Sequence, residues 1–530
     1  MTALVTSPAG SSAGVSPSPA VRDWSGWLFW CGVLPLALVL RGWHIGQQNL
    51  WLDELYALDV ARRPLTEIAW CAAADVHPPL FYILLKIWMN LFGDSAAAVR
   101  SLSVVASLAA LVSVFRLIAP RYSGQVALAT TLLMAVSAHQ IFFAQEARMY
   151  ALVMALLLAS LRGYAMWRES GVERGLAVYL WAALAAMYCH YFALLAIIAV
   201  NAHFVLTAFG PTRTATRRQA RRWFVAQGVM ALLYAPWVEV IVAQMQRGQT
   251  WRKPLTLADA GWQVVGYFQE TTLGYAVYLD HVRAWFARLI VENVNLPGSF
   301  FWQPLTFNIV FILFLTALMS IGLWHNLKLV RTDIRAALPV LFLVLPLLLA
   351  SVLSLRKGSM ELARYLIFTT PAFWFFTAVG LHQVRATFWR LALIGLCVGT
   401  LFWQGARIHY STTARDSDLR PALEFIRRQS RPGERVVIDP DAMDVCLAYY
   451  APRYGLEGMI YSAQMTPTGE PTGHNQLERL IREEGVRRAW VILDYRSEKF
   501  DALAVPGFHV VRQVDFPDAY PKVRVIEVTR

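Results

Sequence analysis

The chain has 530 residues, of which 57% are hydrophobic and 16% charged, and its mean hydropathy is +0.43. This charge content lies well below the roughly 25% of soluble domains, so the composition excludes an ordinary soluble protein and predicts a multispan membrane protein. The net charge of +13 is expected in cytoplasmic loops, where lysine and arginine accumulate, and not on a nucleic-acid-binding face.

The N-terminal segment, residues 1–23, is rich in serine, proline and alanine, and we expect it to be disordered and cytoplasmic. It lacks the basic start of a cleavable signal, so the apolar run at 24–40 is predicted to be a retained span. Further spans should all be helices, because a helix satisfies its own backbone in lipid. They are expected near 96–118, 125–143, 149–167, 176–189, 190–209, 223–245, 302–324, 337–355, 364–383 and 391–408. The result is an α-helical polytopic module of about eleven spans over residues 24–408.

One further apolar run, "HPPLFYILLKIWMNLFG" at 77–93, is short and contains Lys86 and Asn90. A spanning helix needs roughly 20 apolar residues. We therefore expect a helix that lies at the membrane surface, entered through Pro78 and Pro79.

Loop charge sets the predicted orientation. The strongest basic loop holds Arg213, Arg217, Arg218, Arg221 and Arg222, and a second one holds Lys328, Arg331 and Arg335. Both are cytoplasmic, as the positive-inside rule requires, only if 77–93 does not cross and 176–209 crosses twice. The N-terminus is then cytoplasmic, and residues 41–95, 246–300, 356–363 and everything after 408 face the outside.

Residues 409–530 differ from the rest in composition and are predicted to form a small extracytoplasmic α/β domain. "LRPALEFIRRQSRPGERVVIDP" indicates helix, turn and strand, "QLERLIREEGVRRAWVILDY" repeats that order, and 522–529 is typical of a final strand. No GxGxxG or Walker motif occurs, so nucleotide binding is unsupported.

The first outside loop carries two polar motifs. Asp53 and Glu54 follow Trp51, and they suit either a helix N-terminus, where acids are favoured, or a general base or metal ligand at the membrane surface. Asp75 and His77 stand in "DVHPPL", which is either an ordinary turn or a second part of the same site.

Two later segments bring charges to the same predicted face. Glu146 and Arg148 lie where the third span meets the outside, as a surface ion pair or as functional charges. Arg364 begins a span and either snorkels or binds substrate, whereas Arg356 and Lys357 are expected in solvent. Acids activate hydroxyls and arginines hold phosphates, so the set suits transfer of a group from a lipid phosphate to an alcohol.

The acidic pair, followed by "HPPLFY", "FGDSAAAVRSLS", "AQEARMYAL" and "ARYLIFTTPA", resembles the C-type glycosyltransferase (GT-C) superfamily over residues 24–383. The likeness is greatest to bacterial lipid A sugar transferases and protein O-mannosyltransferase relatives. It implies that Asp53 is the catalytic base, that Glu146 is the acid of the second outside loop, and that Arg364 and Tyr365 of "RYL" contact substrate. At the position of His77 the aminoarabinose branch has lysine, so the resemblance implies a different sugar branch.

The resemblance implies an inverting glycosyltransferase that uses a polyprenyl-phosphate sugar and modifies a lipid, polysaccharide or protein hydroxyl on the outer face of the cytoplasmic membrane. Asp53 and Glu54 are the expected catalytic residues; Asp75, His77, Glu146, Arg148, Arg364 and Tyr365 are expected to bind substrate. The sequence leaves open whether Asp53, Asp75 and Glu146 share a divalent cation. The alternatives are an O-antigen polymerase or ligase, a lipid-linked sugar transporter, which should carry its charges near mid-membrane, and a scaffold, which should tolerate loss of Asp53.

Overall fold

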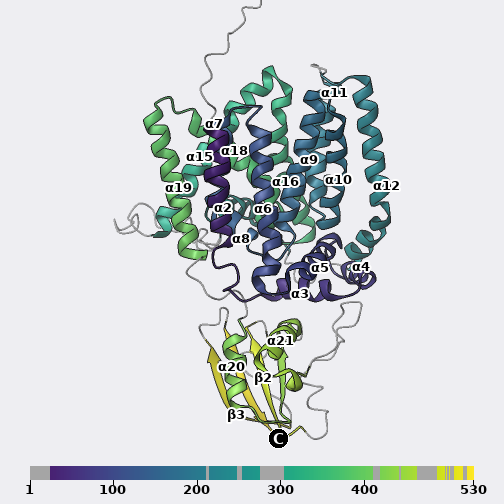
Figure 1. The fold of residues 1–530 in the computed structure, drawn as a ribbon, viewed down its shortest axis with the longest axis vertical. Coiled ribbons are helices and arrows are strands. Elements are labelled where there is room, and N and C mark those ends of the chain that lie inside the picture. The colour runs from purple at the N-terminus through teal and green to yellow at the C-terminus, as the bar shows by residue number, and fades with distance from the viewer. Residues whose placement is uncertain are drawn as a thin grey trace, which may run out of the picture.

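The structure is a computed structural model that describes residues 24–210, 214–247, 254–274, 304–409, 418–440, 443–461, 486–495, 497, 501, 507–516 and 522–530. Figure 1 shows a bundle of long helices with a small sheet domain beneath it. Residues 1–23, expected to be disordered, lie outside the described residues. The predicted fold class, a polytopic helical protein with a small C-terminal α/β domain, is confirmed.

Helix occupies the described part of each run that was predicted to span. Within the described residues, seven helical segments are long and apolar enough to cross a membrane, or eight if one bent pair is counted as a span, so the protein is membrane-embedded. They comprise α1 to α2 (Trp24–Gly42), α6 (Ala96–Ile118), α9 (Tyr150–Ser170), α12 (Arg217–Arg247), α15 (Pro304–Thr332), α16 (Ala337–Lys357) and α19 (Thr387–His409). The other predicted spans are shorter helices, α10 (Glu173–Cys189), α11 (Ala193–Phe209) and α18 (Thr370–His382), and the bent pair α7 (Gly124–Val136) and α8 (Ala138–Ala144).

Three short helices, α3 (Leu52–Arg62), α4 (Leu65–Ala74) and α5 (Leu80–Phe92), lie together at the end of the bundle next to the sheet domain (Figure 1). With 13 residues, α5 is too short to cross, which agrees with the predicted surface helix. Lys86 on α5 donates to the carbonyl oxygen of Arg63, at 2.9 Å, just past the end of α3. A cation is favourable at a helix C-terminus, so this contact joins the two helices.

The bent pair turns by 64° at Ser137, and buried polar contacts compensate for the break. Arg41, fully buried on α2 (Leu34–Gly42), donates to the carbonyl oxygens of Ala135 and Met134 at 2.9 and 3.2 Å. These carbonyls belong to the last turn of α7, where the interrupted helix offers them no amide partner. The bend ends α8 at Ala144, directly before the segment that carries Glu146.

The segment with Arg364 is held by a close helix crossing between α15 and α18. A Cβ atom on Gly322 would overlap the carbonyl oxygen of Phe376, and one on Gly380 would overlap that of Leu318. Glycine at both positions therefore allows the backbones to touch. Since α18 is buried from Thr370 to Leu381, the crossing anchors α17 (Leu362–Tyr365), which lies directly before it, inside the bundle.

The C-terminal domain has a four-stranded sheet in the order β1 (Arg435–Asp439), β2 (Arg488–Asp494), β4 (Val523–Thr529), β3 (His509–Phe516). The β1–β2 pair is parallel and the other pairs are antiparallel. Two helices, α20 (Arg420–Gln429) and α21 (Asp444–Tyr450), belong to the same domain. The predicted helix of "QLERLIREEG" lies outside the described residues.

The C-terminal domain contacts the loop that leads into α3. The Tyr450 hydroxyl accepts a hydrogen bond from the Leu50 amide at 2.6 Å and donates to the Leu50 carbonyl at 3.1 Å. Tyr449 donates to the carbonyl of Asp94 at 3.2 Å. The domain and the first predicted outside loop thus lie at the same end of the bundle, as loop charge predicted (Figure 1).

The basic loops lie at the other end. At its C-terminus α12 contacts α4, because Gln244 donates to Ala72 O at 3.0 Å. Arg217 begins α12, 27 residues before Gln244, and therefore lies about 40 Å from that contact. At the far end Arg168 bonds Gln219 at 3.1 Å, and His203 bonds the carbonyl of Arg335 at 3.2 Å. Both basic loops therefore share the end opposite α3.

Candidate active site

The site begins at the N-terminus of α3, where acids suit the helix dipole. Glu54 is the third helical residue, and its Oε2 accepts from the Trp51 amide at 3.3 Å, as in a capping box. Arg100 approaches from α6 and donates Nε to Oε1 at 2.8 Å and Nη2 to Oε2 at 2.6 Å. The Ala147 amide adds a further bond to Oε1 at 2.8 Å. Both Glu54 oxygens are therefore occupied inside the protein.

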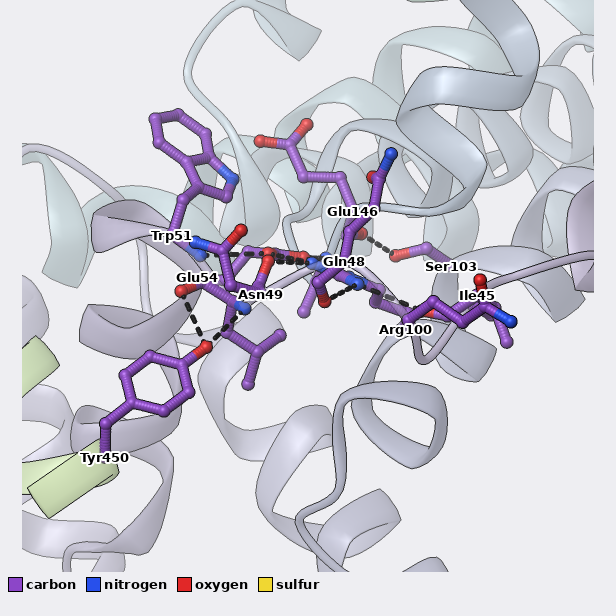
Figure 2. A network of polar contacts seen from close by, with 12 residues as sticks. Ile45, Gln48, Asn49, Trp51, Glu54, Arg100, Ser103, Glu146 and Tyr450 are labelled. Carbon is purple, nitrogen blue, oxygen red and sulfur yellow. Dashed lines mark hydrogen bonds and ion pairs between the residues drawn. The ribbon is translucent and has the colours of Figure 1, made fainter. Parts of the chain in front are cut away.

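Arg100 also fastens the loop before α3. It donates to the carbonyl oxygens of Ile45 at 2.9 Å, Gln48 at 3.0 Å and Asn49 at 2.8 Å (Figure 2). With 1% or less of either side chain exposed, the Arg100–Glu54 pair is a buried structural ion pair. This geometry gives Glu54 a structural role, because both of its carboxylate oxygens are already bonded; its predicted catalytic role stays a prediction.

Arg364 is the centre of the site. Its Nη2 lies 2.6 Å from Asp53 Oδ2 and 3.5 Å from Glu146 Oε1, while its Nη1 lies 3.3 Å from Glu361 Oε2. The Glu146 carboxylate points away from the Arg100 network, although its backbone carbonyl accepts from Ser103 at 2.6 Å (Figure 2). The structure thus brings together Asp53, Glu146 and Arg364, which the sequence predicted to share one face.

A second arginine stands beside the first. Arg148 Nη1 donates to the Asp53 carbonyl at 3.1 Å, and its charge repels that of Arg364. The Nε–H groups of Arg148 and Arg364 are both buried and have no acceptor among the described residues. The Arg364 guanidinium lies between the rings of Trp51 and Tyr150, with its Cζ 5.3 and 4.9 Å from their centroids. Two buried guanidiniums thus keep unused donors in one place.

Asp75 and His77 border this centre. Asp75 accepts from the Tyr82 hydroxyl at 3.3 Å, and burial raises the pKa of its carboxyl, an effect that the charge of Arg148 opposes. The ring of His77 stacks 5.6 Å from that of His190, which lies 5.5 Å from Tyr365. His77 and Tyr365 are therefore linked through a histidine between them.

Sequence reasoning missed His190 and Arg100 as parts of the site. His190 is a polar residue at the junction of two apolar runs in "MYCHYF", and Arg100 stands inside the quoted "FGDSAAAVRSLS". Both carry a recognisable signal, since polar residues next to membrane segments need partners. The partners themselves come from distant segments and are visible only in the fold.

Metal binding was expected at Asp53, Asp75 and Glu146, if anywhere. Within the described ranges, no group of three or more histidine, cysteine or acidic side chains is arranged to hold a metal ion. Arg364 stands between Asp53 and Glu146 instead, where a cation ligated by both would have to sit. The involvement of a divalent cation stays a prediction.

Comparison with known proteins shows which folds this chain resembles. A family described as dolichyl-phosphate-mannose-protein mannosyltransferase matches residues 76–239. The structure is similar to that of ArnT from Cupriavidus metallidurans in the apo state, with a TM-score of 0.58 and 12% identity over 95% of this chain and 98% of that chain. ArnT bound to undecaprenyl phosphate gives a TM-score of 0.56 at the same identity and coverage.

An oligosaccharyltransferase from Archaeoglobus fulgidus, tethered with an acceptor peptide, is similar with a TM-score of 0.50 and 13% identity over 88% of this chain and 70% of that chain. No curated protein matches the sequence significantly. The chain therefore shares the fold of ArnT over nearly its whole length, which agrees with the resemblance to the GT-C superfamily seen in the motifs. Within that class, the segment at 76–239, which holds His77, Glu146 and Arg148, is similar to the mannosyltransferases.

Proposed function

We propose that the protein is an inverting glycosyltransferase that takes a sugar from a polyprenyl-phosphate donor and transfers it to a hydroxyl group of a lipid, polysaccharide or protein. The observation that carries this proposal is the pair of buried arginines, Arg148 and Arg364, whose Nε–H groups lack acceptors among the described residues beside the Asp53 carboxylate. Planar guanidiniums are suited to bind phosphate oxygens. A carboxylate next to them is suited to accept a proton.

A groove next to this centre suits the apolar tail of such a donor. It has a volume of about 340 Å³, lies between α11, α12 and α16, and is lined mainly by apolar side chains. Val76, adjacent to His77, borders it, and so does Met360, four positions before Arg364. Lys357 borders the groove and is itself exposed, as expected from the sequence.

Binding of the donor would break the Asp53–Arg364 ion pair. A lipid phosphate that accepts bonds from Arg364 competes with Asp53, so the donor releases the base when it arrives. Asp53 then takes the proton of the acceptor hydroxyl, whose oxygen forms the new bond to the anomeric carbon. The bond from that carbon to the phosphate oxygen breaks, and a single displacement inverts the centre. Arg364 and Arg148 stabilise the charge that grows on the leaving phosphate.

The basic loops support a proposed orientation. Both lie at the end opposite Asp53, and by the positive-inside rule we propose that the site and the C-terminal domain face the outside of the cytoplasmic membrane.

The direct test is in vitro transfer from a panel of polyprenyl-phosphate sugars, followed by mass spectrometry of the product. We expect one sugar to be transferred with inversion and bare polyprenyl phosphate to be released. Stable binding of the donors without turnover, in the presence of lipid, glycan and peptide acceptors, would refute the transferase and favour a transporter.

A further inference from the structure

A polar cavity of about 400 Å³ lies on the other side of the Arg364 segment. It is enclosed by α13 (Leu257–Leu273) and residues 359–365, and its polar lining consists of Gln263, Tyr267, Glu270, Ser359, Glu361 and Tyr365. It is separate from the residues that the sequence assigned to the site, apart from Tyr365.

One wall of the cavity is helix α13, which is held in place by hydrogen bonds. Thr256 caps the start of α13, where its Oγ1 accepts from the Asp259 amide at 3.2 Å. Further along, the Tyr267 hydroxyl is hydrogen-bonded to Thr369 Oγ1 at 2.7 Å. The cap defines where α13 begins, and the Tyr267–Thr369 bond holds α13 against the turn that directly follows the Arg364 segment.

Two buried polar atoms of the wall lack partners. Glu270 Oε2 and Gln263 Oε1 have no hydrogen-bond partner among the residues that the structure describes. A buried polar atom without a partner is costly, and in native proteins it usually marks a place that a ligand or water completes. The cavity therefore offers hydrogen-bonding groups without partners among the described residues, in a volume that is large enough for a monosaccharide.

The charges of the wall restrict the ligand. Glu270 and Glu361 are both acidic, and no basic side chain lines the cavity among the described residues. Burial, and secondly the charge of Glu361, raise the pKa of Glu270 to about 8, although Arg364 opposes them. Near neutral pH the Glu270 carboxyl is then largely protonated and is able both to donate and to accept. Hydroxyl groups fit these partners, whereas a carboxylate or phosphate meets acidic groups.

The position of the cavity relates it to the donor. Met360 lines both this cavity and the apolar groove between α11, α12 and α16. Tyr365 lines the cavity and contacts Phe192 of the groove, with 5.1 Å between ring centroids. A donor with its lipid tail in the groove thus carries its head group past Arg364 toward the cavity. Tyrosine rings also suit the apolar faces of a sugar.

We propose that this cavity binds the sugar of the donor, that this sugar carries no negative charge, and that Glu270 and Gln263 form hydrogen bonds to its hydroxyl groups. The proposal rests on the proposed function, because it takes the lipid-linked donor as the ligand. It assigns recognition of the sugar to α13, while phosphate and base remain with Arg364 and Asp53.

The test compares binding of bare polyprenyl phosphate with binding of the same lipid carrying a neutral hexose or a uronic acid, on the full-length protein. We expect the hexose to tighten binding about tenfold over the bare lipid, the scale of one or two buried hydrogen bonds, and the uronic acid not to do so. Glu270→Ala should remove the gain and leave affinity for the bare lipid unchanged. Glu457→Ala, at an exposed glutamate of the C-terminal domain, is the matched control.

The outcomes separate the two proposals. If the bare lipid does not bind at all, the proposed function fails and this inference fails with it. If the bare lipid binds but the hexose adds nothing, or if Glu270→Ala keeps the gain, the cavity is not the sugar site and the proposed function stands. Tighter binding of the uronic acid than of the hexose would overturn the assigned charge of the sugar.

Discussion

Replacement of Glu54 by glutamine tests whether Glu54 stabilises the fold while the adjacent Asp53 acts in the reaction. Glu54 and Arg100 are both buried and only 2.6 Å apart, so the substitution leaves a buried guanidinium without its counter-charge. Removal of one partner of a buried pair costs about 3–5 kcal/mol. Since folded proteins are stable by only about 5–15 kcal/mol, we expect a large loss of thermal stability.

The assay is thermal unfolding of the purified protein in lipid nanodiscs, next to Asp53→Asn as the matched variant. Asp53 is 32% exposed, so its amide variant should melt close to the wild type. Its turnover should nevertheless fall about 10²-fold or more, the usual scale for loss of a general base. Glu54→Gln should show the reverse order, with a lower melting temperature as the primary defect.

A double variant measures the interaction free energy between Glu54 and Arg100. Glu54→Gln combined with Arg100→Gln removes both charges, so it should recover part of the stability lost in either single variant, with a coupling of roughly 1–3 kcal/mol. A Glu54→Gln protein that melts with the wild type but has lost turnover would refute this reasoning. Glu54 would then return to the catalytic role predicted from sequence.

Arg364→Ala should raise the donor KM and lower kcat together. Arg364→Lys should restore activity only in part, because the point charge of lysine does not reproduce the planar guanidinium. Arg356→Ala, at an exposed position, is the control and should have a small, salt-sensitive effect in the same kinetic assay. A cysteine at Thr66 should react with an impermeant reagent on intact cells, whereas one at Arg218 should react only after lysis; the opposite pattern would invert the topology. The pKa of Glu270 is raised in the folded state, from 4.5 to about 8, so the folded state holds the proton more tightly and stability should fall as pH rises through that window. Glu270→Gln should remove this slope in melting curves at pH 5, 7 and 9, and an unchanged slope would contradict the shift.

The long spans and the face that carries the site were accessible from sequence because both depend on local signals. Hydrophobic runs set the helices, and loop charge decided that 77–93 does not cross. Asp53, Glu146 and Arg364 could then be placed on one face without knowledge of any contact. Their ion pairs confirm that they are brought together, while their catalytic roles stay predictions.

The different roles of adjacent residues could not be predicted from these local signals. Asp53 and Glu54 are adjacent acids, but consecutive residues of a helix point about 100° apart, so only one of them faces Arg364. Which one does so depends on Arg100, which comes from another helix. The strand β3 was not predicted from the sequence, because its residues are mostly exposed and lack a buried apolar pattern.

The contact between Tyr450 and Leu50 can form only late in the synthesis of the chain. The two residues lie 400 positions apart, so at roughly 5–20 residues per second the second is synthesised about 20–80 s after the first. During that interval the loop before α3 lacks the tyrosine that later bonds both the amide and the carbonyl of Leu50. The domain that is synthesised last therefore completes the contacts of the first loop. A chain that stops before residue 450 keeps the spanning helices described here, but lacks the hydrogen bonds that hold the loop before Asp53.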